Sequence, residues 1–143
     1  MYVFPVNPMM ANCLSSMDKI DKKNIGSIGW CMGGGYSLAA AMNIPDLKAC
    51  VICYGRLVTE EESLEKIKSP VLGIFGEEDR GIPVADVKTF ESALREDGNK
   101  VEIKVYPGVG HAFMNPNNKT GYNEETSNKA WEEIHQFLKT ELK

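Results

Sequence analysis

A single cysteine stands among glycines at the point where an apolar run ends. The stretch from Ile25 to Gly35 reads IGSIGWCMGGG. Its central GWCMG, at 29–33, fits the nucleophile-elbow pattern, in which a strand turns sharply into a helix and exposes a nucleophile. We expect the dipole and free N–H groups of the following helix to favour the thiolate of Cys31 and later an oxyanion. The alternative interpretation is a tight turn around an ordinary buried cysteine.

The neighbours of Cys31 have definite tasks in this interpretation. Gly29 and Gly33 lack a Cβ atom, so we expect them to let the strand and the helix close around the cysteine. The backbone N–H of Met32 would lie at the start of the helix, where it can bind a developing oxyanion.

An acid and a histidine follow two later apolar runs. Asp79 lies in FGEEDRGIP and His111 lies in YPGVGHAF. Taken alone, each has a plainer interpretation, as a solvated acidic turn and as a loop histidine. Together they follow Cys31 in the order nucleophile, acid, histidine, which is the order of a class of hydrolases that use such an elbow. The other histidine, His135, is expected on the surface of the last helix.

The segments between these residues alternate between strand and helix patterns. We expect strands at 24–30, 48–54, 71–75 and 101–106, and helices at 7–20, 32–43, 60–68, 84–97 and 124–142. Alternation of this kind indicates a parallel α/β sheet covered by helices on both faces. Each candidate residue then lies at the carboxyl end of a strand, where such sheets carry their sites. In the last helix the residues expected to point inward are Ala130, Trp131, Ile134, Phe137 and Leu138.

Composition restricts the function classes. The chain has 143 residues, a net charge of −4 and four cysteines. Its length suits one domain, and the absence of a basic stripe argues against nucleic acid and anionic membranes as partners. The apolar runs are too short for a membrane span, and the first residues do not follow a signal-peptide pattern, so we expect a cytoplasmic protein with reduced thiols.

Two cysteines, Cys50 and Cys53, have the spacing of half a zinc site. They lie in a strand-like run, where residues three apart point to opposite faces, and no second cysteine pair or nearby histidine completes a site. We therefore interpret both as small buried hydrophobic residues and expect no metal.

The motifs together resemble the dienelactone hydrolase (carboxymethylenebutenolidase) family of α/β hydrolases. The segments that carry the resemblance are GWCMGGGYS, PVLGIFGEEDRGIP and VEIKVYPGVGHAFMN, and it continues through the closing AWEEIHQFLK. The resemblance implies that Cys31 is the nucleophile, Asp79 the acid and His111 the base. It also implies hydrolysis of small-molecule lactones or short esters through a thioester, without a metal or an organic cofactor.

The chain departs from the family pattern at its N-terminus and at one later position. Only about 24 residues precede the expected elbow strand, whereas the family has further strands and a helix there. We expect a single truncated α/β-hydrolase domain over residues 1–143, with about four parallel strands flanked by helices and the N-terminal strands missing. The second oxyanion-hole donor, an acidic residue and an arginine of the family would be missing too. Asn115 stands where the family's type enzyme has a further arginine.

These departures lead to further expectations. The elbow strand becomes an exposed sheet edge, which predicts a homodimer through that edge. Arg80, beside Asp79, either orients a substrate carboxylate or is a surface cation. The alternative to an active hydrolase is a catalytically impaired remnant of the fold that acts as a binding or interaction module. A dinucleotide-binding half is a weaker interpretation, because GSIGWCMG does not match the required glycine spacing.

Overall fold

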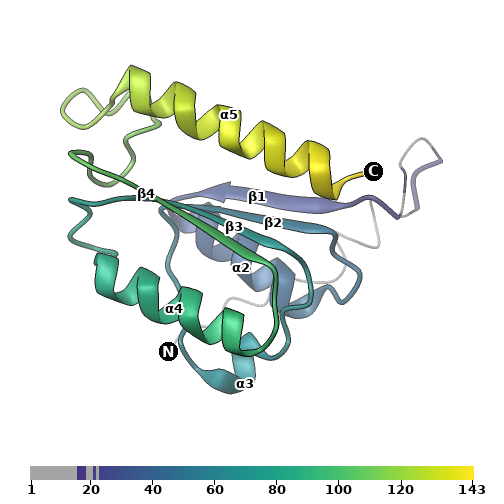
Figure 1. The fold of residues 1–143 in the computed structure, drawn as a ribbon. Coiled ribbons are helices and arrows are strands. Elements are labelled where there is room, and N and C mark those ends of the chain that lie inside the picture. The colour runs from purple at the N-terminus through teal and green to yellow at the C-terminus, as the bar shows by residue number, and fades with distance from the viewer. Residues whose placement is uncertain (1–15, 19–20, 22) are drawn as a thin grey trace.

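The computed structural model describes residues 16–18, 21 and 23–143, which form a three-layer arrangement around one sheet (Figure 1). The elements in chain order are β1 (Gly26–Trp30), α2 (Met32–Asn43), β2 (Ala49–Cys53), α3 (Glu61–Leu64), β3 (Val71–Gly76), α4 (Val84–Glu96), β4 (Val101–Tyr106) and α5 (Glu124–Glu141). The helix expected at 7–20 falls mostly outside the described residues, and the three described residues in it, 16–18, are not helical.

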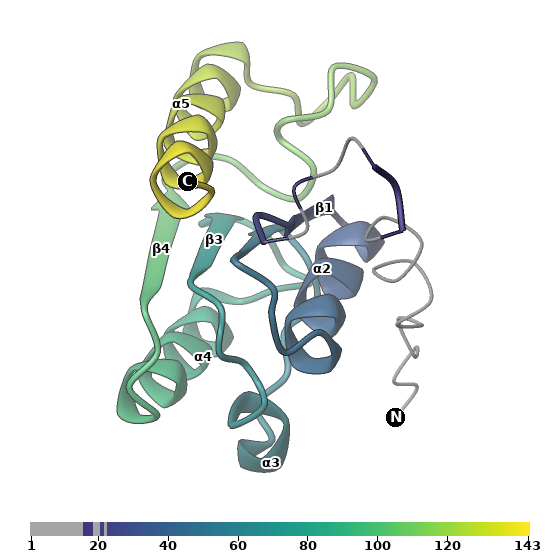
Figure 2. The same ribbon diagram turned by 90° about the vertical axis from the view of Figure 1, so that its right-hand side faces the viewer.

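The sheet is parallel throughout and its strands lie in the order β1-β2-β3-β4. This confirms the expected α/β architecture. The helix α5 lies on one face, and α2 and α4 lie on the other, an arrangement that both views show (Figures 1 and 2). Every residue of β2 and β3 is buried, as their unbroken apolar sequences predicted for strands covered on both faces.

The elbow strand β1 lies at an edge of the sheet, as predicted. Among the described residues it pairs only with β2, in a register that aligns Gly26 with Ala49. Two of its five residues, Gly26 and Ile28, are exposed, and the exposed fraction of Ile28 is 37%. The other edge strand, β4, is half-buried along most of its length.

The apolar faces of α4 and α5 pack inward as predicted, with one exception, whereas the helix expected at 60–68 covers only Glu61–Leu64. Ala130, Ile134 and Phe137 of α5 are buried, but Trp131 is 36% exposed, so the prediction of an inward Trp131 is wrong. Its ring instead packs on that of Trp30, with the centroids 5.4 Å apart. Because Trp30 is on the edge strand, this pair lies at the margin of the sheet, where burial is incomplete.

The two cysteines of β2 behave as predicted. Cys50 and Cys53 are both completely buried and form no disulfide, so they pack as small hydrophobic residues. In the part of the chain that the structure describes, no group of three or more His, Cys, Asp or Glu side chains could hold a metal ion. The fourth cysteine, Cys13, lies outside that part. None of the helices in the described residues has the length and apolar character that a bilayer span requires.

Candidate functional site

The turn between β1 and α2 holds Cys31 in an unusual backbone conformation. Its φ is 54° and its ψ is −121°, a region that residues with a Cβ atom seldom adopt. The N–H of Cys31 donates to the carbonyl oxygen of Cys53 at 3.0 Å, and its own carbonyl accepts from the N–H of Gly34 at 3.0 Å. The turn is therefore fixed at both sides, by the neighbouring strand and by the first turn of α2.

The close approach of β1 and α2 depends on Gly29. A Cβ atom on Gly29 would overlap the backbone carbonyl of Gly33 and would lie 2.8 Å from the backbone nitrogen of Gly34. Gly33 is different, because a Cβ atom there would meet nothing within 4 Å. The expectation that both glycines are needed for closure is thus wrong for Gly33. Its backbone is part of the close contact, but its missing side chain would point into open space.

Met32 is the first residue of α2. Helix N-termini carry backbone N–H groups without a partner inside the helix, so the N–H of Met32 belongs to the group of donors that the sequence suggested for an oxyanion. Met32 is 69% exposed, which leaves this end of the helix accessible from solvent.

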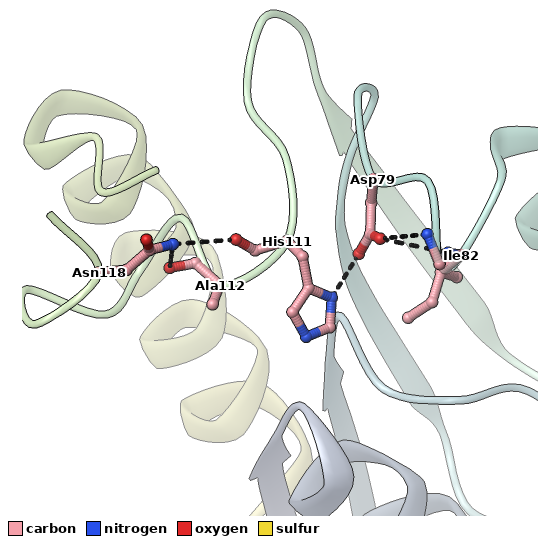
Figure 3. Close-up of polar contacts among 6 residues, drawn as sticks. Asp79, Ile82, His111, Ala112 and Asn118 are labelled. Carbon is pink, nitrogen blue, oxygen red and sulfur yellow. Dashed lines mark hydrogen bonds and ion pairs between the residues drawn. The ribbon is translucent and has the colours of Figure 1, made fainter. Parts of the chain in front are cut away.

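Asp79 and His111 lie together beyond the carboxyl ends of β3 and β4. The Nδ1 atom of His111 is 2.7 Å from Oδ2 of Asp79. The other carboxylate oxygen of Asp79 accepts from the backbone N–H groups of Gly81, at 2.9 Å, and Ile82, at 3.2 Å (Figure 3). Because Asp79 is only 4% exposed and both of its oxygens are bonded, it is a fixed acceptor that orients the imidazole of His111. With Nδ1 engaged in this way, Nε2 points away from Asp79 and is available to accept a proton.

A second close contact brings the histidine loop to Asp79. A Cβ atom on Gly76, the last residue of β3, would overlap the carbonyl of Val109 and lie 2.8 Å from that of Gly110. The N–H of Glu78 donates to the carbonyl of Val109 at 2.9 Å. Glycine at the end of β3 therefore allows the loop after β4 to lie directly against the loop that carries Asp79.

Tyr54 is a residue of this site that the sequence reasoning missed. It follows β2, has a positive φ of 38° and is only 2% exposed. Its ring lies edge-on to the imidazole of His111, with the centroids 5.3 Å apart, and it also contacts Phe113. The available signal was its place at the carboxyl end of the strand expected at 48–54, where such sheets carry their sites.

The electrostatics of Cys31 differ from the expectation of a stabilised thiolate. Partial burial and the negative charge of Asp79 both raise the pKa of the Cys31 thiol above its ordinary value, burial having the larger effect. Both effects favour the protonated thiol and so oppose the stabilised thiolate that the sequence predicted. None of the hydrogen bonds between described residues joins Cys31 to His111, although apo sites often tighten such contacts only when substrate is bound.

The remaining candidates lie at the surface. Arg80 is exposed. Asn115 is exposed and its side-chain oxygen accepts from the backbone N–H of Asn117 at 3.0 Å. His135 is exposed on α5, as predicted, and packs on the ring of Trp131.

A cavity of about 630 Å³ opens beside the elbow. It extends from Met32 along one face of α2 to the segment after β2 and to α3. Apolar side chains line much of it, including Met42, Leu57 and Val58, and Arg56 supplies a positive charge.

Comparison with known proteins gives a consistent family assignment. A family profile described as the Dienelactone hydrolase family matches residues 6–142. A protein of Saccharolobus solfataricus provisionally named carboxymethylenebutenolidase is 38% identical over 117 residues, which cover 82% of this chain and 44% of that protein. A protein of Escherichia coli with the same provisional name is 36% identical, over 78% of this chain and 44% of its own. The chain thus spans less than half the length of these curated relatives.

Solved structures show the same fold. A Klebsiella pneumoniae protein provisionally named dienelactone hydrolase superposes with a TM-score of 0.79 at 31% identity, over 90% of this chain and 57% of that one. A dienelactone hydrolase-like promiscuous phosphotriesterase from metagenomic libraries, at 21% identity, superposes with a TM-score of 0.84 over 93% of this chain and 59% of that one. The four parallel strands with their flanking helices therefore match about half of an α/β-hydrolase fold, and the chain belongs to the dienelactone hydrolase family.

Proposed function

We propose that the chain is a small thiol hydrolase that cleaves lactones or short esters through Cys31, His111 and Asp79. The observation that carries the proposal is the arrangement of three side chains beyond three strand ends. Cys31 stands in a strained turn at the start of α2, while a buried carboxylate binds Nδ1 of the histidine at 2.7 Å. Family membership supports the same reaction class.

Burial and Asp79 raise the pKa of the Cys31 thiol, so we propose a first step that starts from the protonated thiol. As Cys31 Sγ attacks the substrate carbonyl, Nε2 of His111 takes the thiol proton, and the carbonyl oxygen becomes an oxyanion that the N–H of Met32 can bind. The oxyanion collapses, the bond to the alcohol oxygen breaks, and the imidazolium returns the proton to that oxygen. In a lactone this oxygen stays attached to the acyl part, so the ring opens on the enzyme as a thioester.

The second step regenerates the thiol. His111 takes a proton from water as the water attacks the thioester carbonyl, the bond to sulfur breaks, and the proton passes to Cys31. Asp79 keeps the imidazole in one tautomer and stabilises its positive charge in both steps. The cavity beside Met32 is proposed to hold the acyl part, with its apolar side chains around a short hydrocarbon group.

The experiment is hydrolysis of p-nitrophenyl acetate, with mass spectrometry of the protein during turnover. We expect p-nitrophenol release above background and an acetylated protein, both lost in Cys31→Ala. The matched control is Cys50→Ala, which removes a completely buried thiol outside the site and should keep the activity. Equal rates in wild type and Cys31→Ala would overturn the proposal.

One observation favours a second candidate, an interaction module without useful catalysis. Met32 is the single oxyanion donor we identify among the described residues. Loss of one such donor typically costs about two to three powers of ten in rate.

We also propose that the exposed edge of β1 pairs with the same edge of a second copy of the chain. Gel filtration of the wild-type chain tests this dimer by its elution volume.

A further inference from the structure

We infer that Asn118 is a positioning residue that sets the orientation of His111, an inference that rests on the proposed function. The loop between β4 and α5 runs from residue 107 to 123 and carries His111, whose side chain is 46% exposed. Asp79 binds one nitrogen of the ring and Tyr54 contacts its edge. These contacts can form only if the loop backbone places the imidazole beside them.

The side chain of Asn118 reaches back across the loop to that backbone. Its Nδ2 donates to the carbonyl oxygen of His111 at 3.2 Å and to that of Ala112 at 3.4 Å. Figure 3 shows both bonds, on the side of His111 opposite Asp79. Only the amide nitrogen can donate to two carbonyl oxygens, so this environment also determines which way the amide faces.

The backbone at this place needs such support. Ala112 has a φ of 57°, a left-handed conformation that costs a non-glycine residue free energy unless the surroundings impose it. Ala112 directly follows His111, so relaxation of its φ would rotate the histidine away from Asp79. The two hydrogen bonds from Asn118 hold the carbonyl of His111, which precedes Ala112, and the carbonyl of Ala112 itself. Together they oppose that rotation.

Asn118 is itself anchored. Its carbonyl accepts from the N–H groups of Gly121, at 3.2 Å, and Tyr122, at 2.9 Å, and its side-chain oxygen accepts from the hydroxyl of Thr120 at 3.4 Å. The residue thus ties the histidine end of the loop to the end that leads into α5. A hydrogen bond acting on the backbone of His111 can alter catalysis without any contact to substrate.

The test uses Asn118→Asp, which keeps size and shape but replaces the donating NH₂ by an acceptor. The matched control is Asn117→Asp, an exposed neighbour that receives the same charge. We expect kcat for p-nitrophenyl acetate to fall by about ten- to a hundredfold in Asn118→Asp, the range typical of misplaced catalytic groups, with little change in KM. Asn117→Asp should match wild type in both constants.

A second measurement does not depend on turnover. The chain has two histidines, so imidazole NMR with His135→Gln for assignment isolates His111. In wild type we expect the Nδ1-protonated tautomer with a slowly exchanging Nδ1–H, and in Asn118→Asp a broadened or lost Nδ1–H signal. Should wild type hydrolyse no ester, the proposed function fails, but this signal still decides the role of Asn118.

Asn118→Ser provides the test if the aspartate variant does not fold. Its hydroxyl can donate to only one carbonyl, so both kcat and the Nδ1–H signal should lie between those of wild type and a full loss. The inference is overturned if a folded Asn118 variant retains wild-type kcat and an unchanged Nδ1–H signal.

Discussion

Replacing Cys31, the proposed nucleophile, by glycine should give a more stable protein than replacing it by alanine. The reason is the backbone of the elbow, where Cys31 has φ 54° and ψ −121°. A residue with a Cβ atom in such a region costs about 1–3 kcal/mol, which glycine does not incur. Glycine loses about 0.5–1 kcal/mol of this gain because its unfolded chain has more conformational freedom. The free energy of unfolding of the glycine variant should therefore exceed that of the alanine variant by about 0–2.5 kcal/mol, centred near 1 kcal/mol.

The control is Cys31→Ala, which removes the same sulfur but keeps a Cβ atom in the strained conformation. The difference between the glycine and alanine variants isolates the backbone contribution, because both lose the contacts of the half-buried thiol. For a chain of this size, 1 kcal/mol corresponds to about 2–4 °C in the melting temperature.

The assay is thermal and urea unfolding of the three proteins under reducing conditions at pH 7, followed by far-ultraviolet circular dichroism. We expect the midpoint of Cys31→Gly to exceed that of Cys31→Ala in both experiments. If the glycine variant is no more stable than the alanine variant, the backbone at Cys31 does not store strain.

Three further predictions concern the same region and the core. Gly29→Ala should lower the free energy of unfolding by about 3 kcal/mol, because its Cβ atom has no room beside the backbone of Gly33. Gly33→Ala should raise the free energy of unfolding by about 0.5–1 kcal/mol, because alanine favours the helix and its Cβ atom meets nothing there. Urea titration measures both changes, and a reversed order of stability would contradict the geometry. Burial raises the pKa of Cys50 to about 11, so the folded protein keeps this proton between pH 9 and 11 while the unfolded chain loses it. Stability should then fall with rising pH by about 1.4 kcal/mol per unit through this thiol, and Cys50→Ala should show a shallower fall in unfolding experiments across that range. Removing the negative charge in Asp79→Asn should lower the pKa of Cys31 and speed its alkylation by iodoacetamide at pH 8, and slower alkylation than in wild type would refute this account of the thiol.

Much of the fold was predictable because local pattern and global structure agree. The residues of α2 and β4 were predicted with the bounds that the structure shows, and the other strands differ by one or two residues at their ends. Continuous apolar runs such as 71–75 can be satisfied only between two layers of helices. Once the alternation of strands and helices is recognised, the candidate residues must gather at one edge of the sheet.

What failed depends on distances and directions that spacing does not encode. The pattern treats Gly29 and Gly33 alike, but only the first has its missing Cβ directed at backbone. The exposure of Trp131 follows from where α5 crosses the sheet margin, and the helical period does not contain that information. The raised pKa of the Cys31 thiol comes first from its burial and then from Asp79, a carboxylate 48 positions away in sequence, and the local sequence around Cys31 encodes neither.

The strand order has a consequence for how the molecule folds. Each strand pairs in parallel with the strand that precedes it in the chain, with partners such as Gly26 with Ala49 and Val71 with Val101. The sheet can therefore grow in the order of synthesis, one crossover at a time, without waiting for distant segments. The turn at Cys31 is locked by the carbonyl of Cys53 as soon as the second strand docks. His111 joins only after the fourth strand, so a nascent chain carries its strained thiol before the proposed base has emerged.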